Sequence, residues 1–322
     1  MRVLITGAAG FIGSNLCDFF LMKGYSVIGL DNFSTGFKHN MKGFIANPSF
    51  SFIHGDIRDL ENCLQATNGI DIVLHQAALG SVSRSLTDPI ATNEVNIAGF
   101  LNLLEACRIN KVKRFVYASS SSVYGDSDTL PKVENRIGKF LSPYALTKHV
   151  NEIYSEVYAR AFGLKTVGLR YFNVFGRRQD SNGAYAAVIP KFIGKILKGE
   201  NPTINGDGSY SRDFTYIDNV LQMNYLAATT SNEKAINQVY NTAVGGRISI
   251  LEMTELLIYG LQKLAPELSK VKIEFGPERL GDVPHSQASI DKAKRLLDYQ
   301  PTHNFSQGLE ASLEWYYKTL KQ

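Results

Sequence analysis

A tyrosine and a lysine four residues apart are the side chains of this chain best suited to chemistry. Tyr144 and Lys148 lie in the stretch SPYALTKHV, and helical spacing places them one turn apart on one face. We expect the ammonium to favour the phenolate and so to lower the pKa of Tyr144, which makes a base. Just upstream, a short apolar strand over Arg114–Ala118 ends in four serines at 119–122, and a hydroxyl from this run can share the proton that is moved. Together these groups predict removal of a proton from an alcohol while hydride leaves the same carbon.

Taken alone, the Tyr-x-x-x-Lys spacing is common on helices, and a serine-rich strand end is compatible with a plain turn. The N-terminus strengthens the prediction. A strand over Arg2–Thr6 leads into the glycine loop GAAGFIG, a helix through Leu21, and a second strand over Tyr25–Leu30 that ends in Asp31. This order is typical of a dinucleotide-binding unit, with a plain strand-turn-helix as the alternative. The loop and the helix N-terminus are predicted to hold the pyrophosphate through Gly7, Gly10, Phe11, Ile12 and Gly13.

Acidic and small residues at the next strand ends complete the predicted cofactor site. Asp31, with Asn32, is placed to bind the adenosine ribose, and its carboxylate would repel a 2′-phosphate, so NAD is favoured over NADP. After a third strand over Phe50–His54, Asp56 and Ile57 are predicted to flank the adenine ring. The alternative for Asp56 is an N-cap of the helix that starts at Leu60, and the two roles are compatible.

The fourth expected strand, Ile70–Leu74, ends in HQAALGSV. Small side chains there let the backbone run close to the cofactor, and we expect contacts from Gln76, Ala77 and Ala78. His75 is expected to be a hydrogen-bonded structural residue, because no acidic partner is evident nearby.

Alternating strands and helices predict an α/β fold with a doubly wound parallel sheet. A long helix over Pro89–Asn110 and a further strand over Leu164–Arg170 continue the pattern. We expect residues 1–176 to form the NAD-binding domain and residues 177–322 mainly a smaller α+β substrate domain, with some later segments returning to the sheet. Helices of the second part are expected over Val188–Leu197, Asp218–Thr229, Ile250–Leu264, Asp291–Leu297 and Gln307–Tyr317.

Composition excludes several classes of protein. The formal net charge of +4 comes without any basic block, so nucleic acid is not an expected partner. Cys17, Cys63 and Cys107 lack metal-ligand spacing and are expected to be reduced packing residues, with no metal site. No apolar run approaches a membrane span and the first residues do not form a signal peptide, so we expect a cytoplasmic protein that does not bind membranes.

At this point the sequence resembles a known family over nearly its whole length. The glycine loop, Tyr-x-x-x-Lys and the serine-bearing strand resemble the extended short-chain dehydrogenases. HQAALGSV, LSPYALTK, LRYFNVFGRRQD, GAYAAVIPK and SRDF are similar to nucleotide-sugar C4-epimerases, above all those that act on UDP-N-acetylglucosamine. The resemblance implies that Tyr144 is the base, that Lys148 also binds the nicotinamide ribose, and that Ser120 shares the proton. It also implies substrate contacts from Gly80, Ser81, Ser121, Asn173, Ala187, Val188, Arg212, Arg279, Asp282 and Ser286.

The same resemblance implies an activity. It is reversible C4 epimerisation of UDP-N-acetylglucosamine to UDP-N-acetylgalactosamine through a 4-keto intermediate, with transient reduction of bound NAD, in polysaccharide biosynthesis. A small residue at 286 would leave room for the N-acetyl group. UDP-glucose and UDP-glucuronate 4-epimerases remain alternatives, and a non-catalytic NAD(H)-binding regulator is a remote one. Dehydratases and decarboxylases carry carboxylates where this chain has Ser121 and Ser122.

Assembly is the last expectation. The predicted helix over 89–110 and the catalytic helix carry more apolar surface than one core needs, at Val150, Ile153, Tyr154, Val157 and Tyr158. A homodimer through a four-helix interface, as in the family, would cover it; packing within one subunit is the alternative. N-acetylhexosamine epimerases carry a leader ahead of the first strand, whereas this chain begins at the strand, and we expect that difference to affect assembly rather than the site.

Overall fold

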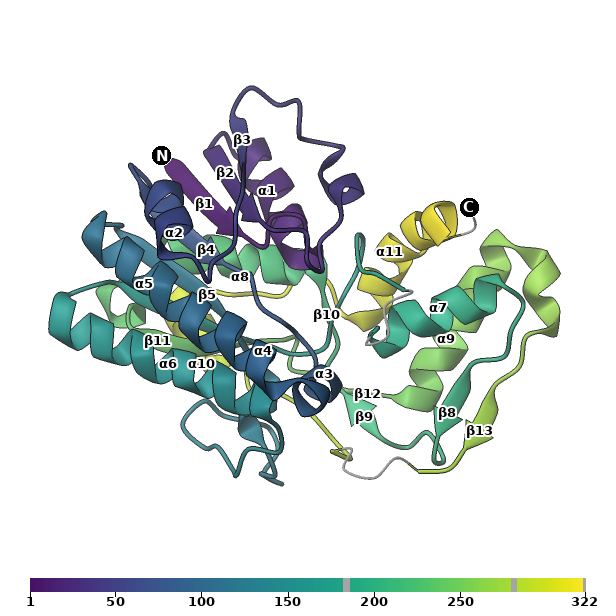
Figure 1. The fold of residues 1–322 in the computed structure, drawn as a ribbon. Coiled ribbons are helices and arrows are strands. Elements are labelled where there is room, and N and C mark those ends of the chain that lie inside the picture. The colour runs from purple at the N-terminus through teal and green to yellow at the C-terminus, as the bar shows by residue number, and fades with distance from the viewer. Residues whose placement is uncertain (182–185, 279–282, 321–322) are drawn as a thin grey trace.

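A seven-stranded parallel sheet forms the centre of the molecule. The computed structural model describes residues 1–181, 186–278 and 283–320. The strand order is β11-β6-β5-β4-β1-β2-β3, so the direction of winding changes between β1 and β4 (Figure 1). The bounds are β1 (Arg2–Thr6), β2 (Ser26–Asp31), β3 (Phe50–His54), β4 (Ile72–His75), β5 (Arg114–Ser120), β6 (Thr166–Tyr171) and β11 (Gln238–Thr242). The predicted doubly wound fold is confirmed, and the carboxyl ends beside the switch point are where ligands of such sheets bind.

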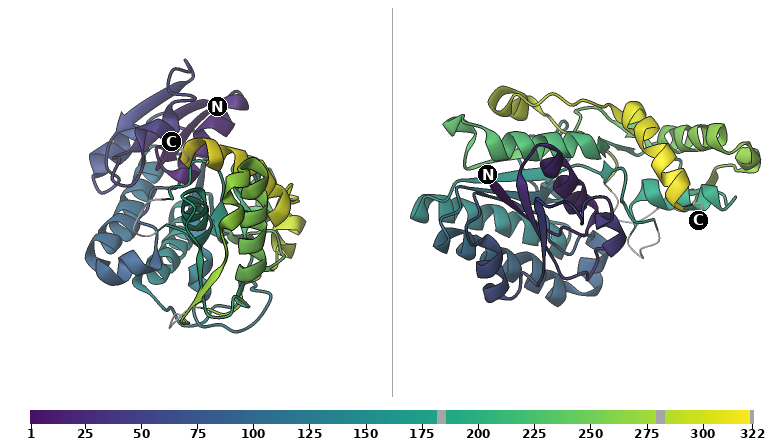
Figure 2. Two further views of the ribbon diagram at one scale, coloured as in Figure 1. Left: turned by 90° about the vertical axis from the view of Figure 1, so that its right-hand side faces the viewer. Right: turned by 90° about the horizontal axis from the view of Figure 1, so that it is seen from above.

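Helices cover both faces of the sheet (Figure 2). One layer contains α2 (Leu60–Thr67), α5 (Phe100–Ile109) and α6 (Pro143–Phe162), and α6 packs on β5 and β6. The other contains α1 (Phe11–Met22) and α8 (Ile217–Thr229), which contact each other. Strands buried on both faces need continuous apolar sequence, and β1, β4 and β5 supply it.

The expected single helix over Pro89–Asn110 is interrupted. The structure has α4 (Pro89–Asn93), a π-helical stretch over Glu94–Gly99, and then α5. Within the wide turns, the Asn96 side chain accepts from Leu79 N at 2.8 Å and donates to Leu79 O at 3.1 Å. The π geometry therefore ties this helix to the loop after β4, a contact that apolar periodicity does not reveal.

A smaller cap follows the sheet at the right of Figure 1. Its helices α7, α9 and α11 pack on one another, and short strand pairs join them to the sheet domain. The remaining bounds are α3 (Val82–Thr87), α7 (Val188–Leu197), α9 (Ile250–Leu264), α10 (Asp291–Leu297), α11 (Phe305–Leu320), β7 (Val174–Phe175), β8 (Thr203–Asn205), β9 (Ser211–Arg212), β10 (Thr215–Tyr216), β12 (Ile248–Ser249) and β13 (Glu274–Gly276).

Three elements beyond residue 176 belong to the sheet layers, as expected for some of the later segments. The strand β11 pairs in parallel with β6, α8 packs on β4, β5 and β6, and α10 packs on β11. The physical reason is that β6 would otherwise be an open edge, and an added parallel strand needs a long connection that local pattern cannot assign. The cap is accordingly smaller than residues 177–322.

The remaining absences apply to the described ranges. The three cysteines are buried and free, which confirms them as packing residues. Within residues 1–181, 186–278 and 283–320, no helix is long and apolar enough to cross a membrane, and no cluster of three or more metal-ligating side chains occurs.

Burial on α1 generates a stability prediction. Leu16 is fully buried in the main core, whereas Met22, on the same helix, is 72% exposed. Leu16→Ala should lower the free energy of unfolding by about 2–5 kcal/mol, because it removes buried methyl groups and leaves a cavity. Met22→Ala should change it by less than about 0.5 kcal/mol. Urea denaturation measures both, and equal losses would show that α1 does not pack as described.

Candidate active site

The helix α6 begins immediately before the predicted base. Ser142 caps it by accepting from Ala145 N at 3.2 Å, and Pro143 occupies the first helical position. Tyr144 is half-buried on the first turn and Lys148, one turn on, is 3% exposed. Lys148 Nζ donates to the Ala118 carbonyl at 2.8 Å and lies 6.0 Å from the centre of the Tyr144 ring. Local capping thus places the predicted pair at the end of β5.

Two serines at the end of β5 continue the polar contacts of Tyr144. Ser120 Oγ accepts from Ser122 N at 3.1 Å and from Ser122 Oγ at 2.9 Å. The Ser120 side chain also lowers the pKa of Tyr144, so it acts directly on the phenol. The hydroxyls of Ser122, Ser120 and Tyr144 therefore follow one another in a chain along which a proton can be shared. Ser122 was not predicted as part of this chain, because its position in the short 3₁₀ turn after β5 is not visible from its spacing.

The electrostatics of the pair differ from the expectation. Burial raises the pKa of Tyr144, and the hydrogen bond from Ser120 opposes that rise. The expected lowering by Lys148 is not found in this structure, where the ammonium is engaged by the Ala118 carbonyl. Burial also lowers the pKa of Lys148 to about 8, against the favourable charge of Glu152. Burial disfavours the charged form of both side chains, so phenolate and ammonium each need hydrogen bonds or opposite charges from neighbouring groups.

His75 has the structural role that was predicted. It is buried, and its Nδ1 lies 2.8 Å from Thr6 Oγ1. Thr6 Oγ1 also accepts from Gln76 N at 3.2 Å and Ala77 N at 3.1 Å, so its own proton goes to the histidine. Burial, with the charge of Lys148, lowers the pKa of His75 to about 3. A neutral His75 thus anchors the turn that follows β4.

A cavity of about 620 Å³ opens at the carboxyl ends of β1, β2 and β4. Nearly all the predicted cofactor residues line it, Tyr144 and Lys148 excepted. The cofactor residues that line it are Gly7, Gly10, Phe11, Ile12, Gly13, Asp31, Asn32, Asp56, Ile57, Gln76, Ala77 and Ala78. Three residues predicted to contact the substrate also line it: Gly80, Ser81 and Ala187. The structure therefore brings the predicted cofactor residues other than Tyr144 and Lys148 together around one cavity.

The glycine loop has the shape that a dinucleotide requires. Gly7 has φ of 68°, and a Cβ on it would come within 2.9 Å of Ala77 N. A Cβ on Gly13 would collide with the Gly7 carbonyl, so helix and strand approach closely only with glycine there. The loop can therefore present bare backbone and the N-terminus of α1 to a pyrophosphate. These residues fit NAD, which in a bound state would supply the hydride acceptor.

The two acidic residues of the cavity are held by neighbours. Asp31 is 8% exposed and accepts from Ala9 N at 2.9 Å and Phe33 N at 2.7 Å, which leaves a lone pair on each oxygen for a ribose hydroxyl. Asp56 is bonded by Arg58 and Asn32, each at 2.8 Å.

The contacts from Arg58 and Asn32 keep Asp56 ionised, and a neighbouring aspartate takes the N-cap role that was the alternative for Asp56. The hydrogen bond from Arg58 dominates burial and lowers the pKa of Asp56 to about 2. The alternative role of Asp56 as a helix N-cap is wrong, because Asp59 caps α2 by accepting from Glu61 N at 2.9 Å.

The predicted substrate residues are only partly brought together. Gly80, Ser81 and Ala187 line the cofactor cavity, and Ser81 has a strained φ of 106°. Asn173 donates to the Asp213 carbonyl at 3.0 Å. Val188 is the first residue of α7.

The others lie elsewhere or outside the described residues. Arg212 Nη1 donates to the Ser211 and Pro284 carbonyls and the residue lines a separate hollow of about 230 Å³. Ser121 and Ser286 are half-buried outside the lining of the cofactor cavity. Arg279 and Asp282 fall outside the described residues.

A segment after β7 closes one side of the cavity and was not predicted to do so. Gln179 and Asp180 line it. Just before them, Arg178 donates to Ser14 O at 2.9 Å and pairs with Asp18 at 2.7 Å, both on α1. The cap is therefore tied directly to the cofactor helix. The motif RRQD was visible in the sequence, but its partners on α1 are some 160 positions away and no spacing rule connects them.

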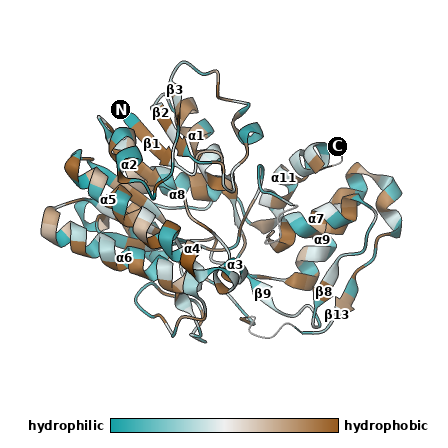
Figure 3. Cartoon of the chain, viewed as in Figure 1, coloured by the Kyte–Doolittle hydropathy of each residue, from teal (hydrophilic) through white to brown (hydrophobic). Residues whose placement is uncertain are grey.

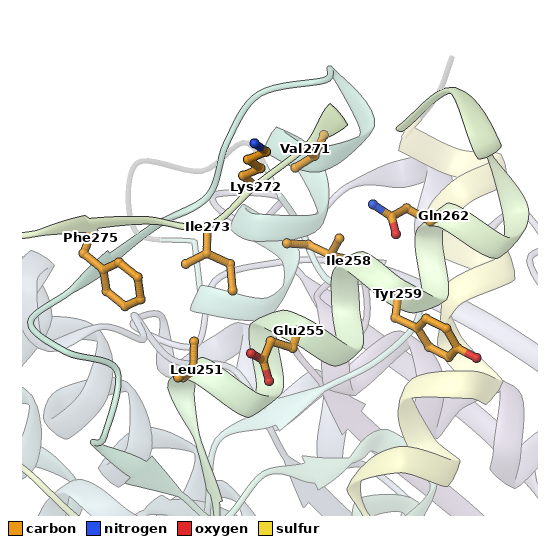
Figure 4. A pocket seen from close by; sticks show the side chains of 9 residues that line it. All are labelled: Leu251, Glu255, Ile258, Tyr259, Gln262, Val271, Lys272, Ile273 and Phe275. Atoms are coloured by element: carbon orange, nitrogen blue, oxygen red, sulfur yellow. The ribbon is translucent and has the colours of Figure 1, made fainter. Parts of the chain in front are cut away.

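A second hollow of about 590 Å³ lies on the cap. It is bounded by α9 and by residues 271–275, and Figure 4 shows Leu251 and Ile258 from the helix facing Ile273 and Phe275. None of its lining residues belongs to the predicted site. It carries no group suited to the chemistry of Tyr144.

The pKa of Lys148 generates a pH prediction. Because burial holds it at about 8, the ammonium that supports the phenolate is lost as pH rises through that value. The rate of hydride transfer to bound NAD should therefore fall above about pH 8. Lys148→Arg keeps its charge and should lose this decline, although its bulk should cost about tenfold in rate.

Stopped-flow absorbance of the reduced cofactor measures the profile. Lys113→Arg, an exposed change, serves as control and should leave it unaltered. A wild-type rate that still rises between pH 8 and 10 would contradict the assignment.

Comparisons with known proteins agree with this geometry. Residues 3–243 match the model of the NAD dependent epimerase/dehydratase family. A putative UDP-glucose 4-epimerase of Methanocaldococcus jannaschii is 35% identical over 97% of both chains. A solved UDP-N-acetylglucosamine 4-epimerase from Methanobrevibacter ruminantium M1, in complex with UDP-N-acetylmuramic acid, has a TM-score of 0.91 and 36% identity over 98% of both chains.

A UDP-glucuronic acid 4-epimerase from Bacillus cereus, solved with UDP-glucuronic acid and NAD, has a TM-score of 0.86 and 35% identity over 99% of both chains. The family model covers well over half of this chain, and the glycine loop lines a cavity at the carboxyl ends of the strands beside the switch point. The chain therefore belongs to the NAD dependent epimerase/dehydratase family.

Proposed function

We propose that this protein is a UDP-sugar 4-epimerase and that its substrate pair is UDP-N-acetylglucosamine and UDP-N-acetylgalactosamine. One observation carries the reaction class: at the end of β5, the hydroxyls of Ser122 and Ser120 lead to Tyr144, one helical turn before the buried Lys148. The cavity that the glycine loop lines supports binding of a dinucleotide. Tyr144 is thereby equipped to take the proton of a secondary alcohol. The 4-hydroxyl of a nucleotide sugar is the alcohol that the similar epimerases suggest.

The residues of the chain have defined tasks in that reaction. Tyr144 removes the proton of the 4-hydroxyl, with Ser120 sharing it and Lys148 balancing the developing negative charge. NAD, which the glycine loop and Asp31 would hold, would supply the acceptor and later the donor for the C4 hydride. Between these events the planar 4-keto sugar would turn over, so that its opposite face is reduced while Tyr144 returns the proton to the 4-oxygen. The sugar must be held more loosely than the nucleotide for both faces to react.

Absence of carboxylates favours epimerisation over related reactions. Elimination of water needs an acid and a base near C5 and C6, and decarboxylation uses a carboxylate at the end of β5. The corresponding positions here are Ser120, Ser121 and Ser122. The hydroxyls of these serines can help to transfer the proton of the 4-hydroxyl but cannot act as the acid or base that the other reactions need. Epimerisation requires only the transfer at the 4-hydroxyl.

Small side chains support the N-acetyl sugar. Gly80, Ser81 and Ala187 line the cavity wall. Ser286 lies beside β9, because its backbone N donates to Ser211 O at 3.0 Å. A serine at 286 leaves space beside C2 that a tyrosine would fill. The likeness to an N-acetylglucosamine epimerase is consistent with this assignment.

Two alternatives rest on particular observations. UDP-glucuronate is favoured by Arg84, a cation on the cavity wall near Ser81, and by the likeness to the Bacillus cereus enzyme. UDP-glucose is favoured by the Methanocaldococcus relative. A regulatory NAD(H)-binding protein has less support, because both Tyr144 and Lys148 are retained.

A substrate panel tests the proposal. UDP-N-acetylglucosamine, UDP-glucose and UDP-glucuronate are offered separately and the C4 epimers are resolved by proton NMR. We expect the N-acetyl sugar to react best, and Ser286→Tyr to lower its kcat/KM by about a hundredfold while UDP-glucose changes by less than about threefold, since a filled pocket excludes only the larger substituent.

Ser286→Ala is the matched control and should keep the wild-type preference. Equal loss for both sugars in Ser286→Tyr would contradict the pocket. Turnover of UDP-glucuronate alone would move the assignment to that sugar, and no turnover of any sugar would overturn the reaction class.

We also infer a homodimer. On α6, Ile153 and Val157 are 48% and 41% exposed, and on the neighbouring α3 and α4 Leu86 and Ile90 are 63% and 72% exposed. Figure 3 shows these helices with apolar segments on the same side of the molecule. Four exposed apolar side chains on adjacent helices support pairing of α6 with its copy across a two-fold axis.

Charge placed in this surface should separate the subunits. The double change Ile153→Arg with Val157→Arg should convert a dimer to a monomer, because two buried like charges would meet their copies across the axis. Size-exclusion chromatography with light scattering gives the mass. Phe275→Arg, on the cap and 57% exposed, is the control and should remain dimeric. A monomeric wild type would contradict the inference.

A further inference from the structure

A buried carboxylate lies one helical turn beyond Lys148. Glu152 is 8% exposed between α6 and the sheet. Arg170 binds it with two hydrogen bonds, Nε to Oε1 at 2.9 Å and Nη2 to Oε2 at 2.8 Å, and Ser119 Oγ donates to Oε1 at 2.5 Å. Burial alone would raise the pKa of Glu152, but the bonds from Arg170, His149 and Ser119 outweigh it and hold the pKa at about 2. Glu152 is therefore ionised throughout the working pH range.

The contacts of Glu152 are in register with those of the catalytic residues. Ser119 and Arg170 are directly paired across β5 and β6. Three consecutive residues of β5 then meet α6: the Ala118 carbonyl binds Lys148, Ser119 binds Glu152, and Ser120 meets Tyr144. A shift of α6 along β5 would break all three contacts together. The contacts of Lys148 and Glu152 each involve a charged group, and so they are the costlier ones to break.

The same network extends to the segment beside the sugar position. Arg170 Nη1 donates to Glu134 O at 3.0 Å, and its guanidinium lies 4.9 Å from the centre of the Tyr124 ring. Tyr124 Oη donates to Asn241 Oδ1 at 2.5 Å, and Asn241 Nδ2 donates to Ser289 O at 3.0 Å. Ser289 is three residues beyond Ser286. The ion pair thus joins the catalytic helix to the chain that carries the proposed specificity residue.

We propose that Glu152 is a positioning residue of the active site: its carboxylate holds α6 in the register at which Tyr144 meets Ser120, and it supplies the countercharge for the buried ammonium of Lys148. The proposal rests on the proposed function only in taking Tyr144 and Lys148 as the reacting pair. Glu152 itself touches neither substrate nor cofactor in this arrangement. It acts through Lys148 and the strand β5.

The groups around both charges define what the carboxylate can change. Lys148 is faced by neutral His75 from β4, by the Ala118 carbonyl from β5, and by Tyr144 and Glu152 from its own helix. The charged and titratable groups that act on Glu152 or feel its charge are Arg170 from β6, Tyr117 from β5, His149 from α6 and Lys292 from α10. Glu152 is the only acid among the groups named around Lys148, so its removal leaves that ammonium without a countercharge in the described site.

Glu152→Gln is the direct test, because it removes the charge and keeps the size. We expect kcat to fall by about tenfold or more with KM for the nucleotide sugar within about twofold, since each pKa unit lost by Lys148 is a tenfold change in its protonation. The basic decline of the rate should move to lower pH. Isotope-edited NMR of the lysine ε-methylene, assigned with Lys148→Arg, should show the same shift in the titration of Lys148. That readout needs no sugar, so it separates failure of this proposal from failure of the proposed function.

Glu152→Gln leaves Arg170 buried without its charged partner, and the variant could fail to fold. In that case a second variant tests the proposal. Glu152→Gln with Arg170→Met replaces the pair by neutral groups, which proteins commonly tolerate. A folded double variant with the displaced pH decline and low kcat supports the proposal. A double variant with wild-type kcat and wild-type titration of Lys148 would overturn it, because Glu152 would then serve only to neutralise Arg170. Ser119→Ala is the matched control: it removes one bond and no charge, and should leave the titration of Lys148 unchanged.

Discussion

Placing the ammonium of Lys148 inside the protein is the constraint on which the rest of the active site depends. A buried charge is stable only with bonds and a countercharge, and the structure provides a carbonyl from β5 and a carboxylate from the next turn of α6. Those partners require α6 to lie flat on β5 at a single register. The parallel sheet in turn aligns the ends of β1, β4 and β5 so that the glycine loop, the His75 turn and the serines open at one edge. Burial of one charge therefore fixes the position of Tyr144 and Lys148 at the end of β5.

Local sequence predicted those parts of the site that are local in the chain. The glycine loop with Asp31 and the Tyr144–Lys148 pair each lie within one or two adjacent elements, and steric or helical rules assign them directly. The strands β1 to β5 were predictable for the same reason, since continuous apolar runs between turn residues mark buried parallel strands. His75 could be assigned by elimination because it had no acidic neighbour.

Other features depend on pairing between distant segments and could not be predicted in this way. β11 is short and mixed in polarity, and it becomes a strand only because β6 offers a partner. Glu152 and Arg170 are 18 residues apart on different elements, and each looks like an ordinary surface charge until the sheet is formed. The pKa of Tyr144 was predicted with the wrong sign, because the spacing shows the nearby lysine but not the burial or the carbonyl that engages it. The interruption of the 89–110 helix likewise follows from the bond between Asn96 and a loop.

The attachment of the cap has a chemical meaning for an epimerase. A cycle that returns its hydride leaves the cofactor unchanged, so any release of cofactor between the two transfers would strand the keto sugar. The structure closes the cavity with Gln179 and Asp180, and the residue before them, Arg178, is bonded to Ser14 and Asp18 on the very helix whose N-terminus faces the pyrophosphate. Opening this side of the cavity therefore means breaking contacts to α1. Such contacts favour retention of the cofactor until the hydride is returned to the ketone, as the proposed cycle requires.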